Sequence, residues 1–114
     1  MFTRSLAFFI FFGGMQMSEW KSQLKELIER RQRQILVHSI IYYKYDQNII
    51  SDYTWSKWAK ELYEMQKANP EIAKDTVLYD IFKDFDYSTG SNLPLDDPWG
   101  NDVASYLMKC QGLV

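Results

Sequence analysis

Apolar residues recur at helical spacing along most of the chain after residue 17. The first such segment has Lys, Glu, Arg and Gln on its other face, which predicts an amphipathic helix with Ser18 as its N-cap. It then becomes almost continuously apolar, and frequent β-branched residues leave a strand as the alternative, but the preceding charge pattern favours a helix. The apolar positions are Trp20, Leu24, Leu27 and Ile28, followed by Ile35–Val37 and Ile40–Tyr43.

A second helix is expected after the turn-forming residues Asp46-Gln47-Asn48, with Ser51 or Asp52 as its N-cap. Asn69-Pro70 ends it, because proline disfavours helical geometry in the residue before it. One apolar face runs through it at i, i+3, i+4, i+7 and i+10, formed by Trp55, Trp58, Ala59, Leu62 and Met65.

Two further helices complete the prediction. Asp75 is the expected N-cap of a third helix, with Leu78, Ile81, Phe82 and Phe85 inward. Residues 87–97 form a loop, and Asp97-Pro98 begins a last helix that ends before Gly112. Its inward residues are predicted to be Trp99, Val103, Tyr106, Leu107 and Cys110. The fold class is therefore all-α: residues 17–114 form a single small domain of about four antiparallel helices.

Residues 1–16 differ from the rest of the chain. The apolar run from Leu6 to Phe12 is too short to cross a bilayer. Gly13-Gly14 must be encoded by purine-rich codons two codons ahead of Met17, which is the spacing of a ribosome-binding site. We therefore expect translation to begin at Met17 or Met15. Residues 1–16 would then be the translation of leader sequence that lies ahead of the true start codon. A short membrane or signal segment and a structured arm are the alternatives.

Composition narrows the class of protein. The chain has 114 residues, 17% of them aromatic, which suits one small domain with a core of rings. Cys110 cannot form an internal disulfide and is interpreted as a small buried or half-buried residue, so a reducing cytoplasm is expected. Residues 17–67 hold nine Lys/Arg and seven Asp/Glu, whereas residues 68–114 hold three and eight. This acidic half argues against extensive nucleic-acid contact.

An ordered set of motifs lies between residues 42 and 72: Tyr42-Tyr43, Asp46, Ser51-Asp52, Glu61-Leu62 and Pro70-Glu71-Ile72. In this order and spacing the set resembles the N-terminal cap domain of bacterial NAD-dependent DNA ligases, over about thirty residues that would form a helix-turn-helix. The segment after it is instead similar to small phage-encoded proteins described as ligase-related. The resemblance implies a stand-alone phage or prophage accessory protein.

The resemblance also implies a ligand, the nicotinamide mononucleotide (NMN) half of NAD. Tyr42, Tyr43 and Asp52 stand at the family's ligand-holding positions, and Trp55 replaces a family tyrosine. Aromatic faces bind an electron-poor cation with about 0.5–2 kcal/mol per ring, and carboxylates accept hydrogen bonds from ribose hydroxyls. The chain departs from the family at Ser56, where a carboxylate is lost. NAD or NMN is thus the candidate ligand, and no cofactor is required.

The same residues have a purely structural interpretation. Tyr42 and Tyr43 lie in an apolar stretch and are then core rings, Trp55 is the first member of the helical face, and Asp52 is a helix N-cap. His38, the single histidine, is interpreted as a core or rim residue rather than a metal ligand, because no second histidine and no nearby cysteine accompany it.

Catalysis by this chain alone is not expected. The Lys-x-Asp-Gly motif that supplies the ligase nucleophile is absent, and Lys83-Asp84-Phe85-Asp86 lacks its glycine. The competing function is a protein-protein interaction module or inhibitor that binds a host replication or defence factor through the acidic C-terminal half. A part of a ligase that works in trans with a separately encoded catalytic domain is a further alternative.

Overall fold

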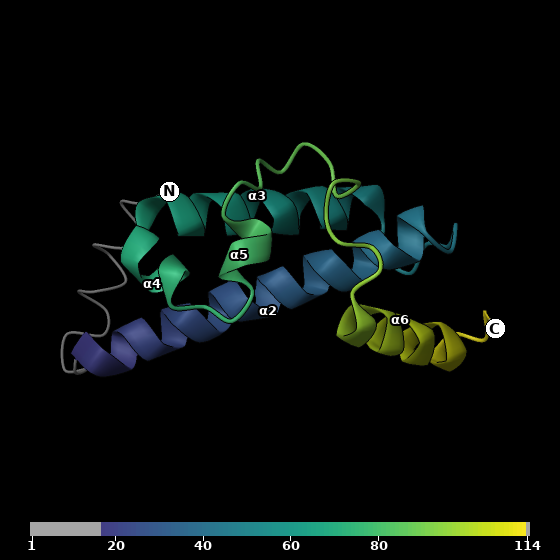
Figure 1. The fold of residues 1–114 in the computed structure, drawn as a ribbon, viewed down its shortest axis with the longest axis horizontal. Helices are drawn as coiled ribbons and strands as arrows, with labels where there is room; N and C mark the ends of the chain where they lie inside the picture. Colours follow the sequence, from purple (N-terminus) through teal and green to yellow (C-terminus); the bar gives the residue numbers. More distant parts are fainter. Residues whose placement is uncertain (1–16, 114) are drawn as a thin grey trace.

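The computed structural model describes residues 17–113, which form five helices and no strand (Figure 1). In chain order they are α2 (Met17–Tyr43), α3 (Asp52–Ala68), α4 (Pro70–Lys74), α5 (Tyr79–Phe82) and α6 (Pro98–Cys110). The all-α class and the single small domain are confirmed. The interpretations of residues 1–16 lie outside the described residues. None of the described helices is long and apolar enough to cross a membrane.

The long helix α2 is the element against which the others pack. Its apolar second half is helical, as predicted, and is covered by α3 on one side and by α6 on another (Figure 1). A β-branched run tolerates helical geometry here because tertiary burial outweighs its weak propensity. Ser18 lies inside the first turn of α2, so its prediction as N-cap is wrong. The α2 residues with 1% exposure or less are Ile28, Gln32, Ile35, Leu36, Ser39, Ile40 and Ile41.

Helix α3 runs antiparallel to α2 and has the predicted ends (Figure 1). The Ser51 side chain accepts a hydrogen bond from the Thr54 N–H, which makes Ser51 the N-cap. Asn69 is the C-cap and Pro70 begins α4 directly. The expected apolar face is confirmed: Ala59 and Leu62 are fully buried, and Trp55, Trp58 and Met65 pack against the core.

The predicted third helix is reduced to the short helix α5, and the short helix α4, which was not predicted, precedes it. Asp75 is the C-cap of α4 rather than the N-cap of a new helix. Its backbone N–H donates to the carbonyls of Ile72 and Ala73, which ends the helix that begins at Pro70. Thr76 then turns inward, where its hydroxyl donates to the Ala73 carbonyl at 2.6 Å. Phe82 and Phe85 are buried as predicted.

A buried hydrogen-bond network joins four helices or their adjoining turns. The Gln residues of α2 are expected on its polar face, but the side chain of Gln32 is fully buried. Its Nε2 donates to Gln66 Oε1 of α3 and to Thr76 Oγ1, both at 2.9 Å. Gln66 Nε2 donates in turn to the Phe82 carbonyl of α5 at 3.0 Å. The network ties α3, α4 and α5 to one point on α2.

The predicted inward face of α6 is wrong in part. Its buried residues are Gly100, Ala104 and Met108, two small residues and a methionine. A Cβ on Gly100 would lie 2.6 Å from Ile40 Cδ1, so glycine is what allows the close approach to α2. Val103 and Leu107 are partly buried as predicted, whereas Trp99, Tyr106 and Cys110 are exposed because the small-residue side of α6 faces the core.

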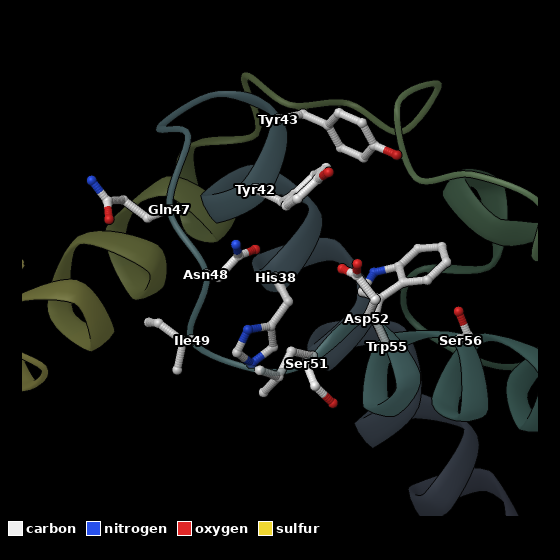
Figure 2. Close-up of a pocket in the computed structure, with 11 residues that line it drawn as sticks. His38, Tyr42, Tyr43, Gln47, Asn48, Ile49, Ser51, Asp52, Trp55 and Ser56 are labelled. Carbon is white, nitrogen blue, oxygen red and sulfur yellow. The ribbon is translucent and has the colours of Figure 1, made fainter.

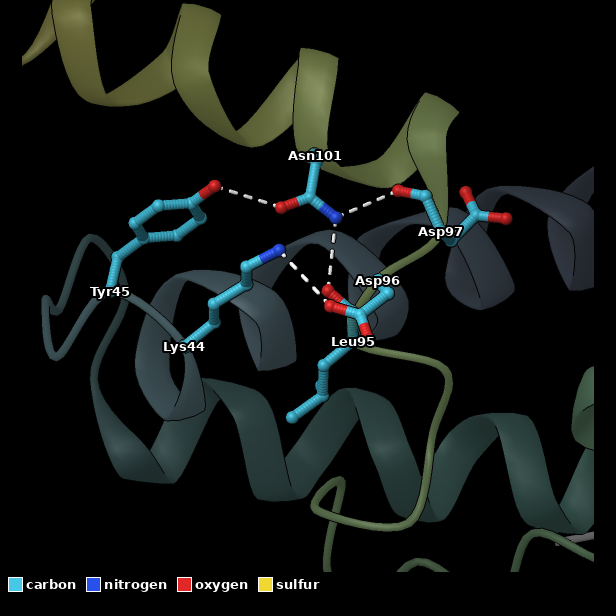
Figure 3. A network of polar contacts seen from close by, with 6 residues as sticks. All are labelled: Lys44, Tyr45, Leu95, Asp96, Asp97 and Asn101. Atoms are coloured by element: carbon cyan, nitrogen blue, oxygen red, sulfur yellow. Dashed lines mark hydrogen bonds and ion pairs between the residues drawn. The ribbon is translucent and has the colours of Figure 1, made fainter.

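Polar contacts anchor the start of α6 to the end of α2 (Figure 3). Asp97 is the N-cap, as predicted, and its carboxylate accepts from the Gly100 N–H at 2.7 Å. Asn101 accepts from the Tyr45 hydroxyl at 2.8 Å and donates to the carbonyls of Leu95 and Asp97. The turn that follows α2 is thereby held in place.

We predict that Gln32→Ala lowers the free energy of unfolding by about 2–3 kcal/mol, because it removes two buried hydrogen bonds and leaves a cavity. Urea denaturation measures the change. Gln23→Ala is the matched control: Gln23 is an exposed glutamine of the same helix, and its loss should cost under about 0.5 kcal/mol. Equal midpoints for both variants would refute the role of the network.

Candidate functional site

A pocket of about 170 Å³ lies where the end of α2, the following turn and the first turn of α3 meet (Figure 2). All four candidate residues from the sequence line it. A cavity of this size holds one aromatic ring. Its lining consists of His38, Tyr42, Tyr43, Gln47, Asn48, Ile49, Ile50, Ser51, Asp52, Trp55 and Ser56.

Tyr42 and Tyr43 are half-exposed rings at one side of this pocket. Their exposed fractions are 47% and 43%, so the alternative that places them in the core is not supported. The two rings meet edge to face, with centroids 4.9 Å apart. The Tyr43 hydroxyl and Thr89 Oγ1 are hydrogen-bonded at 2.9 Å, which restrains Tyr43. Tyr42 is the less constrained of the two.

Asp52 is exposed in the first turn of α3 at the edge of the same pocket. Its structural interpretation as a helix N-cap is wrong, because Ser51 performs that role. The carboxylate of Asp52 makes no hydrogen bond or ion pair within the described chain. It therefore remains available to a ligand.

Trp55 serves both the core and the pocket. Its indole N–H donates to Ser39 Oγ at 3.3 Å, and its ring meets Phe85 edge to face at 6.4 Å. The ring also lines the pocket and lies below Tyr43 in Figure 2. These contacts hold the indole of Trp55 against the core, whereas the ring of Tyr42 is half-exposed.

His38 is a pocket residue that the sequence interpretation left without a function. It is half-buried, as expected for a rim residue, and its ring lies 6.0 Å from that of Trp58. Its Nδ1 has no hydrogen-bond partner among the described residues. Burial lowers the pKa of His38, so the ring is neutral near pH 7. Its position four residues before Tyr42 was the available signal, because that spacing shares a helix face.

The loop of residues 83–97 passes along α3 (Figure 1) and contacts residues next to the pocket. Tyr87 contacts Tyr63 in the middle of α3, with ring centroids 4.8 Å apart. Gly90 then lies against Ser39 and Trp55, and a Cβ there would clash with Ser39 Oγ. Glycine at this position lets the loop pack directly against the Trp55 indole.

Two larger hollows are weaker candidates. One of about 750 Å³ lies between α2 and α4, where Lys25–Asp75 and Lys74–Glu71 already pair at 3.2 and 3.7 Å. The other, of about 340 Å³, lies beside Tyr63, Tyr79 and the acidic residues Asp84 and Asp86. Pro70-Glu71-Ile72 of the motif set lines the first hollow and Pro70 also lines the second, but neither contains a residue at a ligand-holding position of the ligase resemblance.

The acidic loop is stabilised by its own side chains. Asp86 Oδ1 accepts from the Ser88 N–H and hydroxyl, which lowers the pKa of the Asp86 carboxyl.

Within residues 17–113, no group of three His, Cys, Asp or Glu side chains is placed to hold a metal ion.

Comparisons with known proteins assign the chain to no family. No family model, no curated protein and no solved structure matches it. The resemblance to the ligase cap domain therefore rests on the motifs of residues 42–72 alone.

We predict that Gly90→Ala destabilises the protein by about 1–3 kcal/mol, because the added methyl group must displace Ser39 or the loop. The Trp55 indole N–H resonance should shift as well. Asn92→Ala, at an exposed position of the same loop, is the control and should change neither. Unchanged stability and an unchanged indole resonance in Gly90→Ala would show that the loop does not hold Trp55.

Proposed function

We propose that this chain binds the nicotinamide nucleotide part of NAD or NMN in the pocket between α2 and α3, as a stand-alone accessory protein related to the ligase cap domain. It has no ligase activity of its own, because the chain lacks the nucleophile motif. The observation that carries the proposal is the convergence of Tyr42, Tyr43, Asp52 and Trp55 on one pocket.

The chemistry of the pocket suits this ligand. The volume of about 170 Å³ matches one ring and excludes a whole dinucleotide. A pyridinium ring gains from contact with electron-rich aromatic faces, and the neighbouring Asp52 carboxylate can accept from the ribose hydroxyls. The rest of NAD would extend into solvent or toward a second protein, which supports weak binding by the isolated chain.

A second candidate function is protein binding through the outer face of α6. Trp99 and Tyr106 are 43% and 66% exposed, and the acidic residues Asp96 and Asp102 are exposed beside them in the sequence. Exposed aromatic side chains are enriched in protein interfaces. Replacing both Trp99 and Tyr106 with Ser should abolish such binding and leave the nucleotide pocket unchanged.

We predict that NMN binds the protein with a Kd of about 0.1–1 mM, or about −4 to −5.5 kcal/mol. Titration of NMN into ¹⁵N-labelled protein should shift the amide resonances of residues 42–56. Tyr42→Ala should abolish these shifts with little loss of stability, since the ring is only half-buried.

The matched control is Tyr53→Ala, which removes a 76% exposed tyrosine of α3 that does not line the pocket. It should bind NMN like the unaltered protein. If millimolar NMN moves no resonance near Tyr42, Asp52 and Trp55, the nucleotide proposal is wrong and the α6 surface becomes the leading candidate.

A further inference from the structure

The charge around the pocket is unusual for a nucleotide site. Of its eleven lining residues, Asp52 alone carries a charge at pH 7, and no Lys or Arg is among them. Phosphate groups are normally held by Arg, Lys or clustered backbone N–H groups. The lining therefore offers a cation partner, and a phosphate would find no positive side chain.

The lysines that follow pocket residues in the chain are not part of the pocket lining. Lys44 comes directly after Tyr43, but its Nζ pairs with Asp96 Oδ1 at 3.3 Å (Figure 3). Lys57 comes directly after Ser56, is exposed and is not part of the lining. Neither lysine supplies the missing phosphate partner in this structure.

The N-terminus of α3 does not replace a lysine. A helix N-terminus can bind anions through its free N–H groups and its dipole. Here, however, Asp52 already places a carboxylate in the first turn, and the Thr54 N–H is taken by Ser51 Oγ at 3.1 Å. An incoming phosphate would meet a negative charge at this end of the helix.

We propose that the pocket selects a flat pyridinium cation without a phosphate group, the class to which nicotinamide riboside belongs, and that Asp52 is the residue that sets this selectivity. This inference rests on the proposed function, since it assumes that the ring occupies the pocket, and it narrows the ligand from the nucleotide to the nucleoside. Asp52 attracts the ring's positive charge and repels the 5′-phosphate of NMN.

The size of the pocket limits how far the phosphate of NMN can lie from the Asp52 carboxylate. A cavity that holds one ring leaves the ribose at the mouth, beside Asp52, and the phosphate one bond beyond the ribose. A doubly charged group about 8 Å from a carboxylate in a largely aqueous environment should weaken binding about threefold to tenfold. The effect should diminish at high ionic strength.

Two ligand pairs test the inference by following the Trp55 indole resonance during titration. The pair 1-methylnicotinamide and nicotinamide differs in the ring charge, and the pair nicotinamide riboside and NMN differs in the phosphate. We expect 1-methylnicotinamide to bind at least about fivefold more tightly than nicotinamide. The riboside should bind about threefold to tenfold more tightly than NMN at low ionic strength.

Asp52→Asn identifies the cause. It keeps the size of the side chain and should remove the preference for the riboside over NMN, whereas Asp46→Asn, at an exposed carboxylate outside the lining, should keep it. NMN binding as tightly as the riboside, or nicotinamide as tightly as its methylated cation, overturns this inference and leaves the proposed function intact. If none of the four ligands shifts a resonance, both are wrong.

Discussion

The interface between α2 and α3 is the constraint on which the rest of the structure depends. It contains two polar residues of α2, Gln32 and Ser39, both with no exposed surface. Gln32 is hydrogen-bonded to Gln66 near the end of α3, and Ser39 to Trp55 near its start. A buried amide or hydroxyl without a partner costs about 1–3 kcal/mol. Sliding α3 by one turn would break both bonds, so the two pairs specify how the antiparallel helices align.

This alignment also determines where the pocket lies. With Trp55 held beside Ser39, the first turn of α3 comes next to Tyr42 on the last turn of α2, and the turn between them closes the third side. Gly90 supports the indole from behind, and the contacts of Tyr45 and Lys44 with the start of α6 restrain the turn. Tyr42 thus lines the pocket from a helix end that is held by these contacts, while its own ring stays half-exposed.

The sequence predicts the helices well where a long periodic face meets a specific end residue. Helix α3 is the best case, because Ser51 and Asn69-Pro70 mark its ends and its apolar face is regular. The pattern fails at α6, where the large residues Trp99 and Tyr106 suggested the inward face. Gly100 instead packs against the Ile40 side chain, and a pattern of large apolar residues does not predict that contact. No helix begins at Asp75, because Thr76 turns inward and bonds to Gln32, a contact 44 residues apart in sequence.

For the site, the sequence supplied residue types and spacing, and the fold supplied their proximity. Tyr42 and Asp52 are ten residues apart, and only the turn between α2 and α3 brings them to one pocket. His38 was missed because its neighbours in sequence are apolar and no motif includes it.

The most direct test of this account is a set of intermolecular nuclear Overhauser contacts between the ring protons of bound NMN and the side chains of the protein. Binding in the pocket between α2 and α3 predicts contacts to the rings of Tyr42 and Trp55. It predicts none to Tyr63 or Tyr79, which line the hollow of about 340 Å³. Contacts at Tyr63 and Tyr79, without any at Tyr42 and Trp55, would contradict it.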